Sequence, residues 1–282
     1  MRAVQTGDIT LMTEAFGDPH DPAVLLVMGA TASMLGWPDT FCAALVGRGL
    51  HVIRFDHRDT GRSTTVAPGE ATYAVEDMAE DAIAILDAYG IDRAHLIGMS
   101  LGGYLSQMLA VWHPERVASL TLIASEPLGW DGEALPGIDE RFLGHFGALA
   151  SLDWSDHAAV ADFLVESQRL CAGRGAAFDE DRERARVEEV LSRTTSVASM
   201  FNHAALSTRM DWTGRFRDIR CRTLVIHGEN DPILPVENGR AIADGIKGAA
   251  LMVLPLVGHA LPLPDIDPIA ERIAAHAKGT QA

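Results

Sequence analysis

The sequence predicts an α/β fold in which a mostly parallel central sheet is flanked by helices. Two observations carry this prediction: apolar runs of strand length alternate with amphipathic segments of helix length, and the alternation breaks once, between residues 127 and 217. A chain of 282 residues suits one large domain with an insertion, because a core of that size buries about three quarters of the unfolded surface. We therefore expect one domain rather than two independent ones.

The first part of the chain predicts two central strands and the helices that connect them. Residues 23–28 (AVLLVM) and 51–55 (HVIRF) are short aliphatic runs that end at turn or loop residues, as buried parallel strands do. Residues 34–45 have helical periodicity and are followed by glycines, and residues 75–89 form a second amphipathic segment that Gly90 ends. Both helices are expected to be crossover connections.

The pattern then repeats and is interrupted once. Further alternation predicts a strand at 94–98, a helix at 101–112 and a strand at 117–124. The interruption is helical throughout, with helices expected at 138–152, 157–171, 180–193 and 199–210. Alternation resumes with elements at 222–227, 236–246, 250–254 and 268–277. We therefore expect a core of residues 1–126 and 218–282 that carries residues 127–217 as a helical cap.

Composition narrows the classes of partner. The formal net charge is −16, from 39 acidic and 23 basic residues, which disfavours nucleic acid and anionic membranes as partners. Residues 1–8 lack a signal-peptide pattern, and no apolar run approaches the roughly 20 residues that span a bilayer. Three scattered cysteines (Cys42, Cys171, Cys221) and the absence of metal-ligand motifs predict no disulfide framework, metal or cofactor. We expect a cytoplasmic protein that acts on a small molecule.

A short motif predicts a nucleophilic serine. Residues 98–102 (GMSLG) fit G-x-S-x-G and lie where an expected strand turns directly into an expected helix. Gly98 and Gly102 are needed because the serine occupies a strained turn with no room for neighbouring Cβ atoms. We expect Ser100 to project its hydroxyl from the carboxyl end of the sheet.

A serine nucleophile needs a histidine base and a carboxylate that orients it. Asp231 follows the expected strand at 222–227, and His259 follows the one at 250–254, so both are expected at the same sheet edge as Ser100. Glu126 and Glu229 remain rivals for the acid. Among the other histidines, we single out His57 and His203 as possible pocket residues.

The same chemistry needs donors for an oxyanion. One is expected from the backbone N–H of Leu101, directly after the nucleophile, and the other from Ala30, in the loop after the first central strand. Gly29 would let the backbone turn there. Five residues are candidates for contact with the substrate: Gly29, Met34, Trp37, Met99 and Trp130.

With these residues identified, the chain resembles the aclacinomycin methylesterase group of α/β-hydrolases, serine esterases that act on polyketide natural products. The resemblance rests on LLVMG at 25–29, GWP at 36–38, GLHVIRFDHRDTGRST at 49–64, the serine motif, DP at 231–232 and GHALP at 258–262. It implies the α/β-hydrolase fold with a helical cap inserted after the sixth strand. It also implies that Asp56, His57, Arg58 and Arg62 brace a loop beside the active site.

The resemblance defines the reaction better than the substrate. The sequence differs from the family pattern at Ala30, where relatives often have a second glycine, and the similarity becomes weak through residues 127–217. The expected function is hydrolysis of a carboxylic ester or lactone through an acyl-enzyme, on a bulky substrate such as a polyketide methyl ester or, as in related macrolide esterases, a macrolide lactone. The alternatives are a cofactor-free perhydrolase or haloperoxidase, a carbon–carbon bond hydrolase with the same triad, and a ligand receptor on this fold. The oligomeric state stays open.

Overall fold

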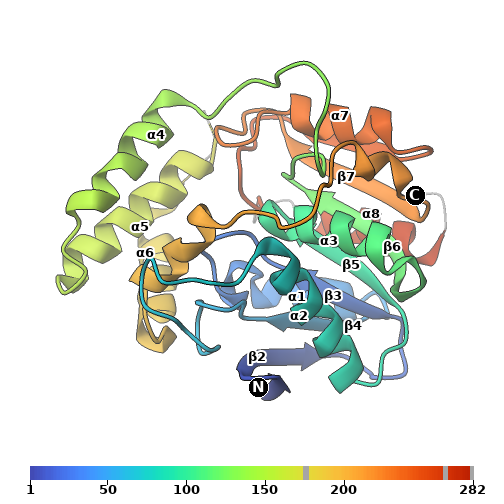
Figure 1. The fold of residues 1–282 in the computed structure, drawn as a ribbon, viewed down its shortest axis with the longest axis horizontal. Helices are drawn as coiled ribbons and strands as arrows, with labels where there is room; N and C mark the ends of the chain where they lie inside the picture. The colour runs from blue at the N-terminus through green and yellow to red at the C-terminus, as the bar shows by residue number, and fades with distance from the viewer. Residues whose placement is uncertain (174–177, 263–265, 280–282) are drawn as a thin grey trace.

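The described part of the chain, residues 1–173, 178–262 and 266–279 of a computed structural model, is built on one eight-stranded sheet (Figure 1). The strand order is β1-β2-β4-β3-β5-β6-β7-β8, with β2 antiparallel to β1 and β4 and every other pair parallel. The strands are β1 (Arg2–Thr6), β2 (Ile9–Phe16), β3 (Ala23–Val27), β4 (His51–Phe55), β5 (Ala94–Met99), β6 (Val117–Ile123), β7 (Arg222–Gly228) and β8 (Ala250–Leu254). The predicted mostly parallel sheet is confirmed.

Helices cover both faces of this sheet. The side chains of β3 alternate between the faces, as the period of two in a strand requires. Leu25 and Val27 pack with α2 (Val75–Ala88), α3 (Leu101–Trp112) and α7 (Glu237–Gly245). On the opposite face, Val24 and Leu26 pack with α1 (Asp39–Val46) and α8 (Ile266–Lys278). Two apolar cores therefore fix the sheet edge at which β5, β7 and β8 end.

Two expectations about local structure are corrected. The helix expected at 34–45 is a 3-10 turn, η1 (Met34–Gly36), followed by α1. Pro38 lies between them in an extended conformation and has no N–H with which to continue the turn. The helix expected at 199–210 is a shorter 3-10 segment, η4 (Ala198–Ala205). In addition, the N-terminal strands β1 and β2 were not predicted.

Most of the chain between β6 and β7 is helical and lies at one end of the molecule, at the left of Figure 1, whereas its last helical turn packs into the main core through Phe216. It contains α4 (Glu140–Gly147), η3 (Ala148–Ser151), α5 (His157–Cys171), α6 (Glu180–Arg193), η4 and η5 (Arg215–Asp218). A small apolar core of Ala161, Val165 and Val187 joins α5 to α6. The fold predicted from the resemblance, with helices inserted after the sixth strand, is confirmed.

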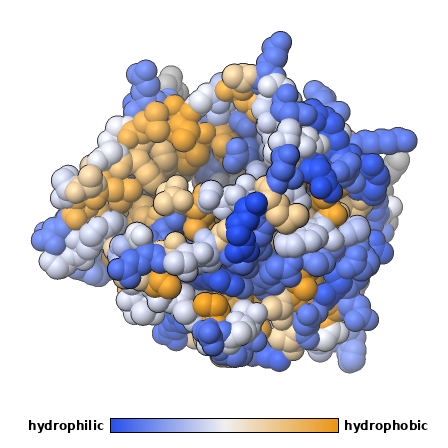
Figure 2. All heavy atoms as spheres, viewed as in Figure 1, coloured by the Kyte–Doolittle hydropathy of each residue, from blue (hydrophilic) through white to orange (hydrophobic). Residues whose placement is uncertain are grey.

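Aromatic rings gather in this helical insertion. Phe201 is the centre of the group, with ring centroids 5.9 Å from Phe146, 5.4 Å from Trp154 and 6.2 Å from Phe163. Phe142 stacks on Phe146 at 4.9 Å. Figure 2 shows apolar residues at the upper left of the molecule, where Figure 1 has α4 and α5. We call these five residues the aromatic cluster.

Candidate active site

The serine motif forms the sharp turn that the sequence predicts. β5 ends at Met99, α3 begins at Leu101, and Ser100 between them has φ 51° and ψ −121°. Such a conformation is costly for a residue with a Cβ atom, so surrounding contacts must hold it. The carbonyl oxygen of Ser100 accepts hydrogen bonds from the backbone N–H of Gly103 at 2.9 Å and from Ser125 Oγ at 3.0 Å. The strained serine is therefore anchored from two elements.

The two glycines of the motif are required by close backbone packing. A Cβ atom on Gly98 would lie 2.3 Å from the carbonyl oxygen of Gly102, and one on Gly102 would lie 2.0 Å from that of Val27. Neither position can hold a larger residue unless the backbone moves. The motif thus sets the approach of α3 to β3 and β5.

Asp231 and His259 meet at the same edge of the sheet. His259 Nδ1 lies 2.8 Å from Asp231 Oδ2, and both side chains are buried. Because a carboxylate only accepts, Nδ1 carries the proton and donates, which leaves Nε2 of the neutral imidazole free to accept. The other oxygen, Oδ1, accepts from the backbone N–H groups of Ile233 and Leu234, both at 2.9 Å.

The carboxylate is held in its charged form. Burial alone would raise the pKa of Asp231, but His259 and His227 together hold it well below its usual range. His227 Nε2 lies 3.3 Å from Asp231 Oδ2 and 2.7 Å from the carbonyl oxygen of Leu234. This second histidine was not predicted as a site residue, because its position inside an apolar strand indicates only packing. The rivals Glu126 and Glu229 are exposed.

The loop after β3 lies directly against the serine. A Cβ atom on Gly29 would lie 3.2 Å from Ser100 Cβ, so Ala30 follows at the edge of the same site. Leu101 is the first residue of α3, where the backbone N–H has no partner within the helix. Both predicted oxyanion donors are therefore located on the two segments that border Ser100.

The loop after β3 is also bordered by two histidines. His57 Nε2 lies 2.9 Å from the carbonyl oxygen of Met28, and His203 Nδ1 lies 3.2 Å from the backbone nitrogen of Thr31. Both were predicted as possible pocket residues. The structure gives both rings backbone partners in the loop, which for His57 agrees with the bracing role that the resemblance implies. The partner of His203 cannot be inferred from sequence spacing.

The remaining substrate candidates lie in packed surroundings. Trp37 is fully buried and stacks on Phe41 at 5.5 Å between ring centroids. Trp130 lies against Phe216 at 5.9 Å, and its Nε1 donates to the carbonyl oxygen of Glu133. These contacts give both tryptophans a packing role, and their contact with substrate stays a prediction. Met34 and Met99 are also buried, at 1% and 8% exposure.

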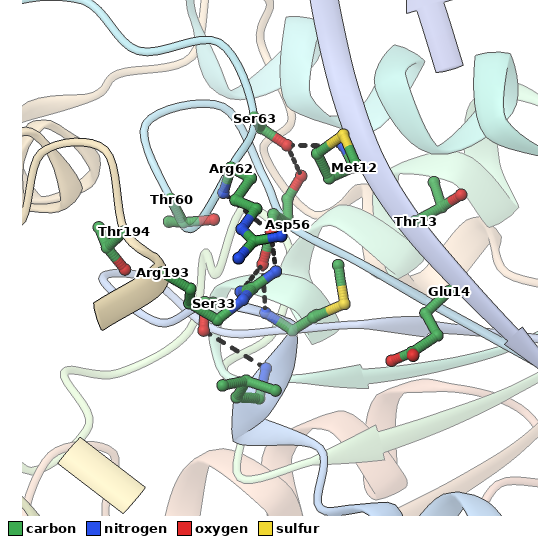
Figure 3. A network of polar contacts seen from close by, with 12 residues as sticks. Met12, Thr13, Glu14, Ser33, Asp56, Thr60, Arg62, Ser63, Arg193 and Thr194 are labelled. Carbon is green, nitrogen blue, oxygen red and sulfur yellow. Dashed lines mark hydrogen bonds and ion pairs between the residues drawn. The ribbon is translucent and has the colours of Figure 1, made fainter. Parts of the chain in front are cut away.

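A buried ion pair joins the helical insertion to the core beside this site (Figure 3). Asp56, fully buried after β4, accepts from Arg193 Nη1 at 2.9 Å and Nη2 at 2.7 Å. It also accepts from the backbone N–H groups of Met34 at 2.8 Å and Arg62 at 3.1 Å. These contacts agree with the bracing role that the resemblance implies for Asp56 and Arg62.

The described residues show neither a cluster of metal-ligating side chains nor a membrane-spanning helix. The residues that the structure describes contain no group of three or more His, Cys, Asp or Glu side chains that could hold a metal ion. Among the same residues, no helix is both long and apolar enough to cross a bilayer.

Comparison with known sequences defines the class. A sequence model described as the alpha/beta hydrolase fold matches residues 22–265. The chain belongs to this family, and its strained serine and buried His–Asp pair lie at the sheet edge where open α/β sheets bind ligands.

Individual relatives carry hydrolase names. Rhodomycin D methylesterase of Streptomyces sp. (strain C5) is 34% identical to this chain over 98% of each sequence. A putative carbamate hydrolase of Variovorax paradoxus (strain S110) is 33% identical over 88% of each. Among solved structures, Est816, described as an N-acyl homoserine lactone degrading enzyme, is 25% identical with a TM-score of 0.70 over 96% of each chain. The resemblance to methylesterases is confirmed, and the protein is an enzyme of the carboxylic ester hydrolase type.

Proposed function

We propose that the protein cleaves a carboxylic ester through an acyl-enzyme formed on Ser100. The observation that carries this proposal is the buried 2.8 Å hydrogen bond between His259 Nδ1 and Asp231 Oδ2. It fixes the imidazole in the tautomer that can take a proton on Nε2, at the sheet edge where Ser100 is held in its strained turn.

The proposed reaction has two acyl-transfer steps. Ser100 Oγ attacks the ester carbonyl carbon while His259 Nε2 takes its proton, and the backbone N–H groups of Ala30 and Leu101 stabilise the oxyanion. The bond to the leaving alcohol breaks as His259 returns the proton to it. Water then attacks the acyl group by the same route, which releases the acid and restores Ser100.

The substrate we propose is a bulky, largely apolar ester, such as a polyketide methyl ester or a lactone. The 34% identity to a rhodomycin D methylesterase supports the first, and the likeness to an N-acyl homoserine lactone degrading enzyme supports the second. Residues 127–217, which we propose as a cap over the site, contain the aromatic cluster and the exposed Leu143 (52%) and Ile138 (40%). Such a surface suits a large apolar ligand.

The test compares substrates and removes the nucleophile. Short p-nitrophenyl esters, bulky polyketide methyl esters and macrolide lactones are assayed with wild type and Ser100→Ala. We expect turnover of a bulky class and a loss of at least about 10³-fold in kcat in the folded variant. A fluorophosphonate should label the wild type at Ser100, located by mass spectrometry. Serine-independent turnover, or no turnover on any ester, would contradict the proposal.

A further inference from the structure

The loop that carries the proposed oxyanion donor Ala30 is anchored on both sides by histidine side chains. On one side, His57 Nε2 lies 2.9 Å from the carbonyl oxygen of Met28. On the other, His203 Nδ1 lies 3.2 Å from the backbone nitrogen of Thr31. His57 belongs to the core, after β4, whereas His203 belongs to η4 in the helical insertion. Ala30 therefore lies between one anchor from each part of the chain.

The partners of His203 fix its tautomer. The backbone N–H of Thr31 only donates, so Nδ1 must be unprotonated, and the carbonyl oxygen of Arg58, 2.8 Å from Nε2, only accepts, so Nε2 carries the proton. The neutral ring thus accepts from one loop and donates to another. Burial agrees with this form, because it lowers the pKa of His203, which is 5% exposed.

Thr31 needs such an anchor. Its φ is 59°, in the left-handed region that residues with a Cβ atom rarely adopt. A residue held there persists only where the surroundings specify it. An oxyanion donor acts only when its N–H lies about 2.7–3.1 Å from the developing charge, so a loop that relaxes at Thr31 would misplace the neighbouring N–H of Ala30.

We infer that His203 is a positioning residue for the oxyanion loop, supplied to the catalytic site by the helical insertion. It acts through Thr31 and touches no reacting atom. The inference rests on the proposed function, because it gives the Ala30 N–H its role in ester hydrolysis. It follows that the insertion contributes to turnover by orienting the Ala30 N–H that stabilises the oxyanion, in addition to any contact that the insertion makes with substrate.

The test separates this role from general support of the fold. His203→Leu removes both hydrogen bonds of the imidazole, the one with Thr31 N–H and the one with the carbonyl oxygen of Arg58. In His203→Gln only the donor toward Arg58 can be kept. In His203→Asn an acceptor remains at the δ position that faces Thr31. The matched control is Asn202→Leu. Asn202 is the neighbouring residue of η4, 4% exposed, and it hydrogen-bonds to Asp59 at 2.9 Å and to Gly69 N–H at 2.7 Å.

Four quantities are measured: thermal stability, kcat, KM on an ester that the wild type cleaves, and affinity for an aryl trifluoromethyl ketone, whose adduct with serine presents an oxyanion. We expect His203→Leu and His203→Gln to lose about 10- to 100-fold in kcat and in ketone affinity, with KM within about threefold. His203→Asn should retain kcat within about fivefold, and Asn202→Leu should lose stability but keep kcat.

Each result decides the inference. If His203→Leu and Asn202→Leu change kcat equally, or if His203→Leu keeps its ketone affinity, the positioning role is wrong while the proposed function stands. Should His203→Leu fail to fold, the comparison of His203→Gln with His203→Asn gives the same decision, because they differ in the acceptor toward Thr31. A wild type without Ser100-dependent turnover overturns the proposed function itself and this inference with it.

Discussion

At the scale of single residues, the Asp231 carboxylate determines what His259 can do. Its two oxygens accept from two backbone N–H groups and from His259 Nδ1, and His227 Nε2 lies 3.3 Å from Oδ2. Three donors and a nearby second imidazole hold the charge and the orientation of this buried carboxylate together. The imidazole that faces it is therefore restricted to the tautomer that a general base needs.

Asp231→Asn should remove that restriction and leave the size of the side chain unchanged. An amide can donate to Nδ1, which would place the imidazole proton on Nε2 and block proton transfer from Ser100. We expect kcat on the best ester to fall by about 10³- to 10⁴-fold with a small change in KM. Glu126→Gln and Glu229→Gln are the controls, because both residues were rivals for the acid and both are exposed. A larger loss in either control would reassign the acid.

Whether a residue of this site can be predicted depends on how far apart along the sequence the residues of each contact lie. Ser100, Asp231 and His259 can be placed because each follows a recognisable strand, and parallel strands bring their carboxyl ends to one edge. The anchoring role of His203 cannot be placed in this way, since its partner Thr31 is 172 residues away. Such contacts depend on how the insertion packs on the core, which no local pattern encodes.

At the scale of elements, the helical insertion supports two loops of the proposed active site. η4 reaches the oxyanion loop through His203, and the end of α5 reaches the histidine loop. His259 N–H donates to the carbonyl oxygen of Cys171 at 2.7 Å, and Gly258 N–H donates to that of Ala172 at 3.0 Å. Gly258 must be glycine here, because a Cβ atom would lie 2.2 Å from the Cys171 oxygen. The insertion is therefore part of the framework that holds the proposed triad.

Arg193 is the residue that should most affect the docking of α6. Removing it would leave the fully buried Asp56 carboxylate without its cationic partner, so we expect Arg193→Met to lower the free energy of unfolding by about 3–5 kcal/mol. Denaturant titration measures this. The matched change Arg184→Met breaks an exposed pair with Asp162 and should have an effect below about 1 kcal/mol.

A double variant checks the cause of that loss. Adding Asp56→Asn to Arg193→Met removes the uncompensated charge, so the pair of substitutions should destabilise by clearly less than the sum of the two single changes. Additive losses would mean that Arg193 acts through packing of its side chain and not through the ion pair.

The strands after residue 22 were predictable from their own apolar sequences, and the two N-terminal strands were not. Most of the parallel strands are buried apolar runs, whereas in β2 (ITLMTEAF) only Leu11 and Thr13 are buried. The buried Thr13 is polar and the half-buried Met12 beside it is apolar, so the sequence of β2 does not show the alternation of a half-buried strand. β1 has one buried residue, Val4. These strands are specified by pairing with each other and with β4, so their evidence lies in the sheet more than in their own sequences.

At the scale of the whole molecule, stability depends on histidines that are buried in the neutral form. Burial, together with the nearby His203, lowers the pKa of His57 to about 3, and burial lowers that of His95 to about 4. In the unfolded chain a histidine titrates near 6.5. Below that pH the unfolded state binds protons that the folded state does not, so these groups favour folding fully above pH 6.5 and progressively less as the pH falls toward their folded pKa.

His57→Gln isolates this effect, because a glutamine amide can still donate to the carbonyl oxygen of Met28 but binds no proton. Between pH 7 and pH 5 one histidine with these two pKa values weakens folding by about 2 kcal/mol. We therefore expect the free energy of unfolding to fall by about 2 kcal/mol more in the wild type than in His57→Gln between pH 7 and pH 5. Denaturant titration at both pH values measures this difference. The carboxylates are common to both proteins and cancel in the difference. His20→Gln, at an exposed position, should keep the wild-type pH dependence. Equal slopes for wild type and His57→Gln would mean that His57 is protonated in the folded protein, which its contact with Met28 alone does not forbid.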